Sequence, residues 1–287
     1  MLRLLCLGLM LGLSVPAWGP AAAQTGMASE RHVRVADIVW DVMRLDNLAS
    51  VMREEAVAEA SSMAATMFPR GGTGQWLDQV AAINDPARIR TLFVDGMARA
   101  MATADPDAVQ QGLAFYRTVF GQRLLVLEAE ARRAMQDAGA DARAREAFGQ
   151  ALGRRDPRAA RIVRLVRAAD LIEPNVAGNL NATIAFSRGF AAGGGFPAPP
   201  SDIEITQNAW AQEPRVRAET EAWIGAYLFL AYGVLGDAEL DRYIAYAGST
   251  GGQTLSRLMF AGFDAVLSVT SRDMGRAAAI ELRGRAL

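Results

Sequence analysis

The stretch Leu113–Leu124 reads LAFYRTVFGQRL, and a second stretch, Ile244–Leu255, reads IAYAGSTGGQTL. Apolar residues at helical spacing flank a polar turn in both, so we interpret each stretch as an αα-hairpin whose second helix begins at Gly-Gln. The following positions match, each pair 131 residues apart without insertion or deletion: Phe115/Tyr246, Gly121/Gly252, Gln122/Gln253 and Leu124/Leu255. The match predicts two copies of one helical unit, in which these residues and Tyr116 form a structural corner.

An acid followed by proline recurs along the chain and predicts helix starts. Aspartate at the N-cap accepts from a free backbone N–H, and proline at the first helical position loses no hydrogen bond. The pairs are Asp85-Pro86, Asp105-Pro106, Asp156-Pro157 and Glu213-Pro214. Ser201–Glu204 has the spacing of a capping box. Since strand periodicity is almost absent, the sequence predicts an all-α protein.

The helix order repeats around these landmarks. We expect a signal peptide at 1–23, a first unit at 33–138, an arginine-rich helical connector at 139–156, and a second unit at 157–283. Trp76 precedes the Pro86 helix and the first hairpin, as Trp210 precedes the Pro214 helix and the second. We expect Trp76, Trp210 and Trp223 to be core anchors, and Arg167 to correspond to Arg44. The stretch Ala222–Leu235 is apolar on every face and predicts the buried centre of the second unit.

The N-terminus predicts export through a cleaved signal peptide. Arg3 precedes an apolar run, Leu4–Leu13, and Ala21–Ala23 offers a cleavage site. The run is too short for a permanent transmembrane helix. Cleavage would remove Cys6, the single cysteine, and with it any disulfide. We therefore expect a periplasmic or secreted protein without a transmembrane segment in the mature chain.

The charge composition excludes several kinds of chemistry. The chain contains no lysine, which excludes Schiff-base enzymes, Ser-Lys dyads and P-loops. A formal net charge of −1 does not suggest a nucleic-acid partner. The segment Arg132–Arg167 is locally basic, with ten arginines and four acids. Two interpretations fit it: a surface that docks on an anionic partner, or a solvated and salt-bridged connector.

Catalytic and metal motifs are weak in this sequence. His32 is the only histidine, and we expect it in a disordered terminus, so the usual zinc, copper and iron ligands are lacking. The stretch Ala247–Gly251 departs from the nucleophile-elbow pattern at its first glycine. Glu128 and Arg132 are spaced for a local ion pair. Carboxylate chemistry is the remaining enzymatic route, and its candidates are Glu54, Glu55, Glu59 and Glu221. We predict no catalytic residue, no metal site and no cofactor.

Two groups of side chains suggest a ligand site. Asn175 and Asn179 share a helical face, with Asn181 close by, and would line a polar pocket or form an interhelical hydrogen-bond network. Methionines suit an adaptable cavity for an apolar ligand, and the candidates are Met63, Met67, Met97, Met101 and Met135.

The matched hairpins resemble those of the domain of unknown function 2059 family, at Phe115-Tyr116-x4-Gly121-Gln122-Arg123-Leu124 and again at Tyr246–Leu255. The resemblance implies an exported helical protein, here in duplicated form, and supplies no catalytic residues. It differs at Ser249–Gly251, where the family commonly has a proline-containing turn.

These observations favour a non-enzymatic binding or scaffolding protein of the cell envelope, whose partner is an envelope protein. One alternative is a carrier that holds a small apolar or amphipathic ligand between its helices. A carboxylate-only hydrolase is the other.

Overall fold

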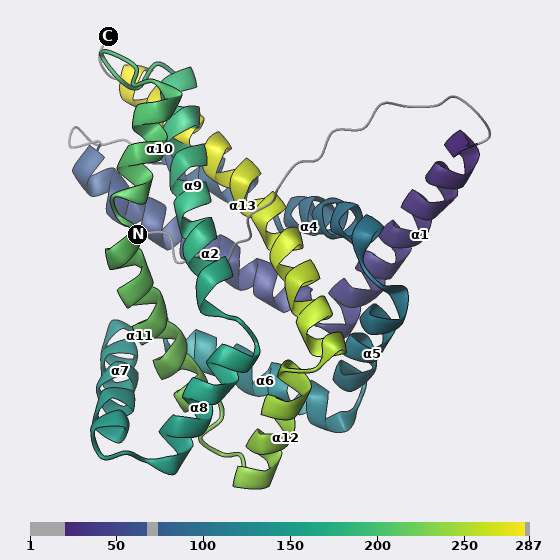
Figure 1. Cartoon of the computed structure of the whole chain (residues 1–287). Coiled ribbons are helices and arrows are strands. Elements are labelled where there is room, and N and C mark those ends of the chain that lie inside the picture. Colours follow the sequence, from purple (N-terminus) through teal and green to yellow (C-terminus); the bar gives the residue numbers. More distant parts are fainter. Residues whose placement is uncertain (1–20, 68–73, 285–287) are drawn as a thin grey trace.

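The computed structural model describes residues 21–67 and 74–284, and in them every regular element is a helix, which confirms the all-α class (Figure 1). The predicted signal peptide, 1–23, lies outside these residues except for its last three positions. The elements are α1 (Ala21–Val42), α2 (Leu45–Met67), α3 (Gly74–Ile83), α4 (Pro86–Ala100), the short 3-10 helix η1 (Met101–Thr103), α5 (Pro106–Tyr116), α6 (Val119–Ala134), α7 (Ala138–Gly153), α8 (Pro157–Ala168), α9 (Ile172–Ala192), α10 (Asp202–Trp210), α11 (Glu213–Ala231), α12 (Asp237–Ala247) and α13 (Thr250–Gly284).

Local capping chemistry explains most helix starts. The side chains of Asp85, Asp105 and Asp156 accept from backbone N–H groups at the starts of α4, α5 and α8, each followed by proline. Ser201 and Glu204 form the predicted capping box of α10. The predicted start at Glu213-Pro214 is confirmed, because α11 begins at Glu213, but Glu213 is the first helical residue and the N-cap is Gln212. Gln212 has helical dihedral angles, which leave no extended residue to act as a side-chain cap.

The two predicted corners make corresponding hydrogen bonds. Thr118 Oγ1 accepts from the N–H of Gly121 at 3.0 Å, and Ser249 Oγ accepts from that of Gly252 at 3.1 Å. The second helices therefore begin at Val119 and Thr250, two residues before the glycine and not at it. A Cβ on either glycine would overlap the carbonyl oxygen of Phe115 or Tyr246. Glycine is needed here for close approach, not for an unusual φ.

The glutamine after each glycine ties its corner to another helix junction. Gln122 Nε2 donates to the carbonyl oxygens of Tyr116 at 2.7 Å and Val42 at 2.9 Å. Gln253 Nε2 donates in the same way to the carbonyl oxygens of Ala247 and Ala168. Arg44 lies two residues after Val42, and Asp170 lies two residues after Ala168. Both have a positive φ, 55° for Arg44 and 48° for Asp170. The position that Arg44 occupies beside the first corner is therefore occupied by Asp170, and not by Arg167, beside the second.

Each of the two main hydrophobic cores includes residues from a helix of the other predicted unit. One cluster combines α1, α2, α4 and α5 with Leu255, Leu258 and Phe263 of α13. Another combines α7, α8, α11 and α12 with Leu124 and Ala131 of α6. The second arm of each hairpin thus contributes to the core of the other half, while α6 also contributes to the core of its own, and α13 crosses the middle of the molecule against α9, α4 and α5 (Figure 1). The unit boundaries stay a prediction.

Burial differs from expectation in the second half. Trp76 is fully buried and donates to the carbonyl oxygen of Ala60, as predicted for an anchor. Trp210, however, is 56% exposed on α10. The apolar stretch Ala222–Leu235 is no continuous buried helix, because α11 ends at Ala231 and Val234 is 65% exposed in the following turn. The predicted anchoring of Trp210 and full burial of this stretch are wrong.

The arginine-rich segment is salt-bridged. Arg145 pairs with Asp141 at 2.9 Å, and Arg161 pairs with Asp237 at 2.9 Å and Asp241 at 3.2 Å. Its central helix, α7, packs against α11 through Phe148. These contacts support the salt-bridged interpretation, but α7 is a packed element of the fold and not a free connector. His32 likewise lies within helix α1, not in a disordered terminus.

Candidate functional site

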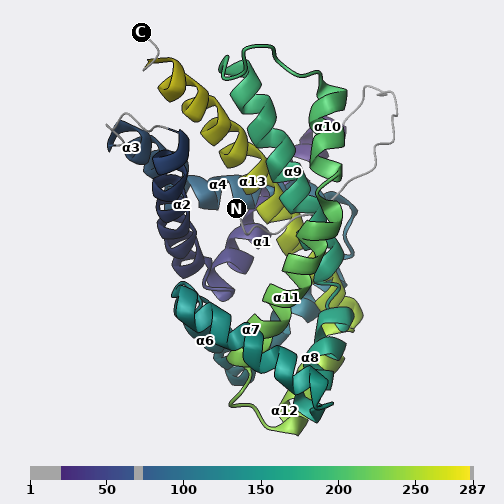
Figure 2. The same ribbon diagram turned by 90° about the vertical axis from the view of Figure 1, so that its left-hand side faces the viewer.

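A cavity of about 540 Å³ lies between the two main hydrophobic clusters. Its walls come mainly from α2, α6, α9, α11, α12 and α13, with single residues of α5, α7 and α8. In Figure 2, α2 and α6 lie on one side of this region and α11 on the other. Apolar side chains from distant parts of the sequence line it, among them Leu48, Ile224, Met259 and Phe263. Exposed charged residues of both signs, Glu130, Arg133, Arg215 and Glu219, surround it.

All five tyrosines of the chain line this cavity: Tyr116, Tyr227, Tyr232, Tyr243 and Tyr246. Tyr116 and Tyr243 share a hydrogen bond of 3.1 Å between their hydroxyls, and Tyr246 donates to the carbonyl oxygen of Gly112 at 2.9 Å. Burial raises the pKa of every one of these hydroxyls above its ordinary value. The cavity wall is therefore aromatic, and its phenols are neutral at physiological pH.

Glu128 lies beside these tyrosines. Its Oε1 accepts a 2.5 Å hydrogen bond from the Tyr232 hydroxyl, and its backbone carbonyl accepts one of 3.1 Å from Tyr227. Burial raises the pKa of Glu128 to about 7, although the hydrogen bond from Tyr232 acts in the opposite direction. Glu128 is half-buried as a residue and belongs to the lining of the cavity. A titratable group is thus placed in the wall of a mainly apolar chamber.

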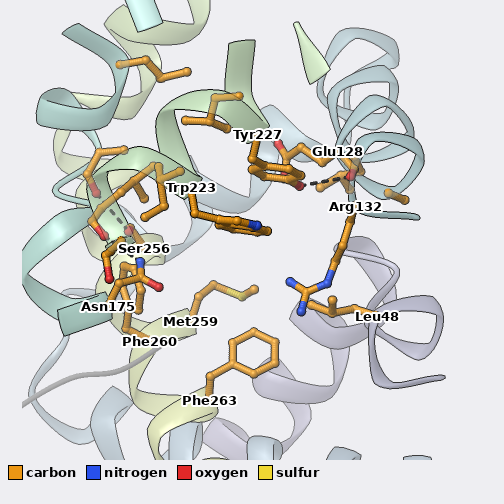
Figure 3. A pocket seen from close by; sticks show the side chains of 18 of the residues that line it. Leu48, Glu128, Arg132, Asn175, Trp223, Tyr227, Ser256, Met259, Phe260 and Phe263 are labelled. Carbon is orange, nitrogen blue, oxygen red and sulfur yellow. Dashed lines mark hydrogen bonds between the residues drawn. The ribbon is translucent and has the colours of Figure 1, made fainter. Parts of the chain in front are cut away.

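Trp223 supplies a hydrogen-bond donor without an acceptor. Its ring stacks on Tyr227 with centroids 5.0 Å apart and an interplanar angle of 9°. Its Nε1 is buried and has no hydrogen-bond partner among the described residues. Figure 3 shows the nitrogen edge of this indole turned toward the space that the Arg132 guanidinium also enters. A buried unsatisfied N–H costs about 1–3 kcal/mol, which makes this donor an informative feature of the site.

Arg132 is held by an acid from a different helix. Its Nε and Nη2 donate to the two carboxylate oxygens of Glu55 on α2, at 3.1 and 2.7 Å. The side chains are 16% (Arg132) and 35% (Glu55) exposed, so this bidentate pair is partly desolvated. The predicted local ion pair between Glu128 and Arg132 is therefore wrong. Each side chain instead finds a partner that is distant in sequence, Tyr232 for Glu128 and Glu55 for Arg132.

A second cavity of about 550 Å³ adjoins the first. Arg132 and Trp223 belong to the lining of both, so these two side chains separate the chambers. Glu54, Glu55 and Glu59 border the second cavity, whereas Glu221 is exposed on α11 and lines neither. The structure thus gathers three of the four glutamates that we considered for carboxylate chemistry, with Glu55 bound to Arg132.

Four residues assigned from sequence to the structural corners also line the main cavity: Tyr116, Tyr246, Gly252 and Leu255. Phe115 stacks on Tyr246 behind this wall, with ring centroids 3.7 Å apart. Gly121, Gln122, Leu124 and Gln253 lie in the corners outside the lining, and Trp76 and Trp210 lie elsewhere in the fold. The corners therefore shape one side of the site.

Only some of the asparagines and methionines that we considered for a ligand site line the main cavity. Asn175 and Asn179 line the cavity, and each donates to a carbonyl oxygen one helical turn earlier. Asn181 donates to Asp264 on α13 at 3.3 Å. Of the five predicted methionines, Met135 borders the second cavity, whereas Met97 and Met101 are buried in a core and Met63 packs against another cluster, so none of these four lines the main cavity. Met43 and Met259 line the main cavity instead, while the Met67 side chain lies outside the described part of the chain.

Sequence reasoning missed Glu128, Tyr227, Tyr232 and Tyr243 as members of one site. A signal existed in the distribution of tyrosine, since all five are confined to the two hairpins and the apolar stretch of the second half. Nothing in local spacing indicates, however, that these segments converge on Glu128.

Over residues 21–67 and 74–284, no group of three or more His, Cys, Asp or Glu side chains is placed to hold a metal ion. In the same part of the chain, no helix has both the length and the apolar character needed to cross a bilayer. Comparison of the chain with protein-family models, with curated proteins and with solved structures gives no match.

Proposed function

We propose that this protein binds and carries a small amphipathic molecule in the cavity between its helices. The single observation that carries the proposal is the chamber of about 540 Å³ lined by apolar and aromatic side chains, into whose wall Glu128, Arg132 and Trp223 bring polar groups. A chamber of this size and character is typical of small-molecule sites. The proposal favours the carrier over the scaffolding protein that we expected first.

The composition of the lining supports an amphipathic ligand over a purely polar one. Most of the lining is apolar, and its phenols stay uncharged, so a hydrocarbon or ring system would be desolvated there at about 25 cal/mol per Å² of apolar surface. Indole and guanidinium donors at one end would orient a polar head (Figure 3). In small-molecule sites, a few polar groups within a mainly apolar pocket usually fix the orientation of the ligand.

We also propose that the protein acts outside the cytoplasm, after removal of residues 1–23, and that its two halves arose by duplication of a unit related to the domain of unknown function 2059 family. The apolar run Leu4–Leu13 supports export. The corresponding hydrogen bonds of Thr118 and Ser249, and of Gln122 and Gln253, support duplication.

Native mass spectrometry of protein isolated from its natural source without detergent tests the carrier function. We expect a complex with one small molecule, which denaturation releases and which extraction identifies. A protein that has only its apo mass, and that also fails to bind added amphiphiles, would refute the proposal. Loss of a hydrolytic activity on Glu128→Gln would instead favour an enzyme.

A further inference from the structure

The donors at the junction of the two cavities indicate the chemistry of the head group. The Trp223 indole N–H has no acceptor among the described residues, although most buried donors are satisfied in folded proteins. Indole can only donate, so the missing partner has to be an acceptor. A ligand that supplied an oxygen at this point would remove the cost of the unsatisfied donor.

Arg132 adds a second donor on the same side. Its Nε and Nη2 are engaged by Glu55, whereas Nη1 donates to no other group in the described structure. The Arg132–Glu55 pair fixes the guanidinium between the two chambers, where Trp223 also lies. Two N–H groups, one of them cationic, thus face a shared space at the end of an apolar chamber (Figure 3).

The exposed charges around the main cavity and Glu128 leave the choice between an anionic and a cationic head to the two donors. The surrounding side chains Arg133 and Arg215 are balanced by Glu130 and Glu219, so these exposed charges do not select a sign. Inside, Glu128 has its pKa raised by burial and is largely uncharged below neutral pH. An uncharged Glu128 neither repels an anion nor attracts a cation.

We propose that the ligand is an acidic amphiphile, a molecule with an apolar chain and a carboxylate head that accepts hydrogen bonds from Trp223 Nε1 and Arg132 Nη1. The chain lies along Leu48, Met259 and Phe263, which Figure 3 shows around the same space. This inference rests on the proposed carrier function and specifies its ligand.

Three probes with apolar chains of about the same length but different head groups test the inference: decanoate, decanol and decyltrimethylammonium. Calorimetric titration at pH 6.5, below the aggregation concentration of each probe, gives three dissociation constants for the whole protein. We expect decanoate to bind roughly tenfold or more tightly than decanol, as charge-assisted hydrogen bonds would produce, and decyltrimethylammonium to bind most weakly.

Variants assign the preference to the two donors. Trp223→Phe removes the N–H, and Arg132→Gln removes the charge. Each should bring decanoate to within about threefold of decanol while changing decanol affinity little. The matched controls are Trp210→Phe and Arg188→Gln, which alter exposed residues outside the cavity lining and should leave the preference intact. Thermal melting of every variant identifies any that fails to fold, and either donor variant alone suffices for the comparison.

The outcomes separate the inference from the carrier function. Equal affinity for the three probes, preference for decyltrimethylammonium, or a decanoate preference that survives in either folded donor variant would overturn the acidic head group while leaving a carrier. Failure of all three probes to bind would overturn both.

Discussion

The Tyr232 hydroxyl donates a 2.5 Å hydrogen bond to Glu128 Oε1, joining the end of α11 to the middle of α6 across 104 residues of sequence. This contact leaves a carboxyl in the wall of an apolar cavity, where burial raises its pKa to about 7. Glu128 is therefore the group whose ionisation most directly links the cavity to solution pH.

Glu128 should make stability fall as pH rises through the neutral range. Its pKa rises from the ordinary value of 4.5 to about 7 in the folded chain, so between these values the folded state binds more protons than the unfolded state. The free energy of unfolding then decreases with pH, by on the order of 3 kcal/mol in total, and levels off above the folded pKa.

Urea unfolding at pH 5 and pH 8 measures this effect. In Glu128→Gln the decrease should be smaller by most of that amount, whereas Glu221→Gln, an exposed control, should behave like the wild type. Histidine ordinarily dominates the pH dependence between pH 5 and pH 8, and the chain contains only one, His32, so the contribution of Glu128 can be recognised. Equal pH dependence in all three proteins would contradict the assignment.

Tyr232→Phe should raise the pKa of Glu128 further. The hydrogen bond from Tyr232 favours the ionised carboxylate, so its removal leaves burial unopposed. The side-chain carboxyl carbon of Glu128, followed by NMR across a pH titration, reports the change. Tyr246→Phe is the matched control, since its hydroxyl donates to the Gly112 carbonyl oxygen. A pKa that stays the same or falls in Tyr232→Phe would show that the contact does not govern ionisation.

Gly121→Val should destabilise the fold by more than about 2 kcal/mol, because any Cβ at this corner overlaps the Phe115 carbonyl oxygen. Gly149→Ala is the control. Its Cβ meets nothing on the exposed face of α7, and alanine is the better helix former by roughly 0.5–1 kcal/mol. Denaturant unfolding compares the two variants. Near-wild-type stability of Gly121→Val would refute the structural role of the corner.

Gln122→Ala and Gln253→Ala should cost similar amounts, each about 1–3 kcal/mol, because each leaves two backbone carbonyl oxygens without this donor. Gln150→Ala, whose amide donates to Glu146 on an exposed surface, should be nearly neutral. Denaturant unfolding of the three variants measures these differences in the free energy of unfolding. A cost at only one of the two corners would contradict their equivalence.

The sequence predicts features that depend on a few neighbouring residues. The caps of α4, α5 and α8, the capping box of α10 and the corner glycines all follow from local backbone chemistry. The prediction fails where a distant partner competes with a local one. Glu128 and Arg132 satisfy the spacing for a local pair, but the Tyr232 hydroxyl and the Glu55 carboxylate provide more buried, better-directed contacts.

Local sequence also does not predict whether a single aromatic residue is buried. Trp76 and Trp210 follow the same sequence landmarks, yet one is fully buried and the other is 56% exposed, because burial depends on the elements that cover each helix. Convergence of the five tyrosines likewise requires that α6 and α13 each contribute to the core of the other half, which no local pattern encodes.

The most direct test of the carrier function is the affinity of a cavity-blocked variant for decanoate. Ala129 on α6 lines the cavity, whereas Ala134 is exposed near the end of the same helix and lies outside the lining. We expect Ala129→Trp to bind decanoate at least about tenfold more weakly than the wild type, because the indole occupies the space of the chain, and Ala134→Trp to bind it unchanged. Unaltered affinity in a folded Ala129→Trp protein would contradict the cavity as the ligand site.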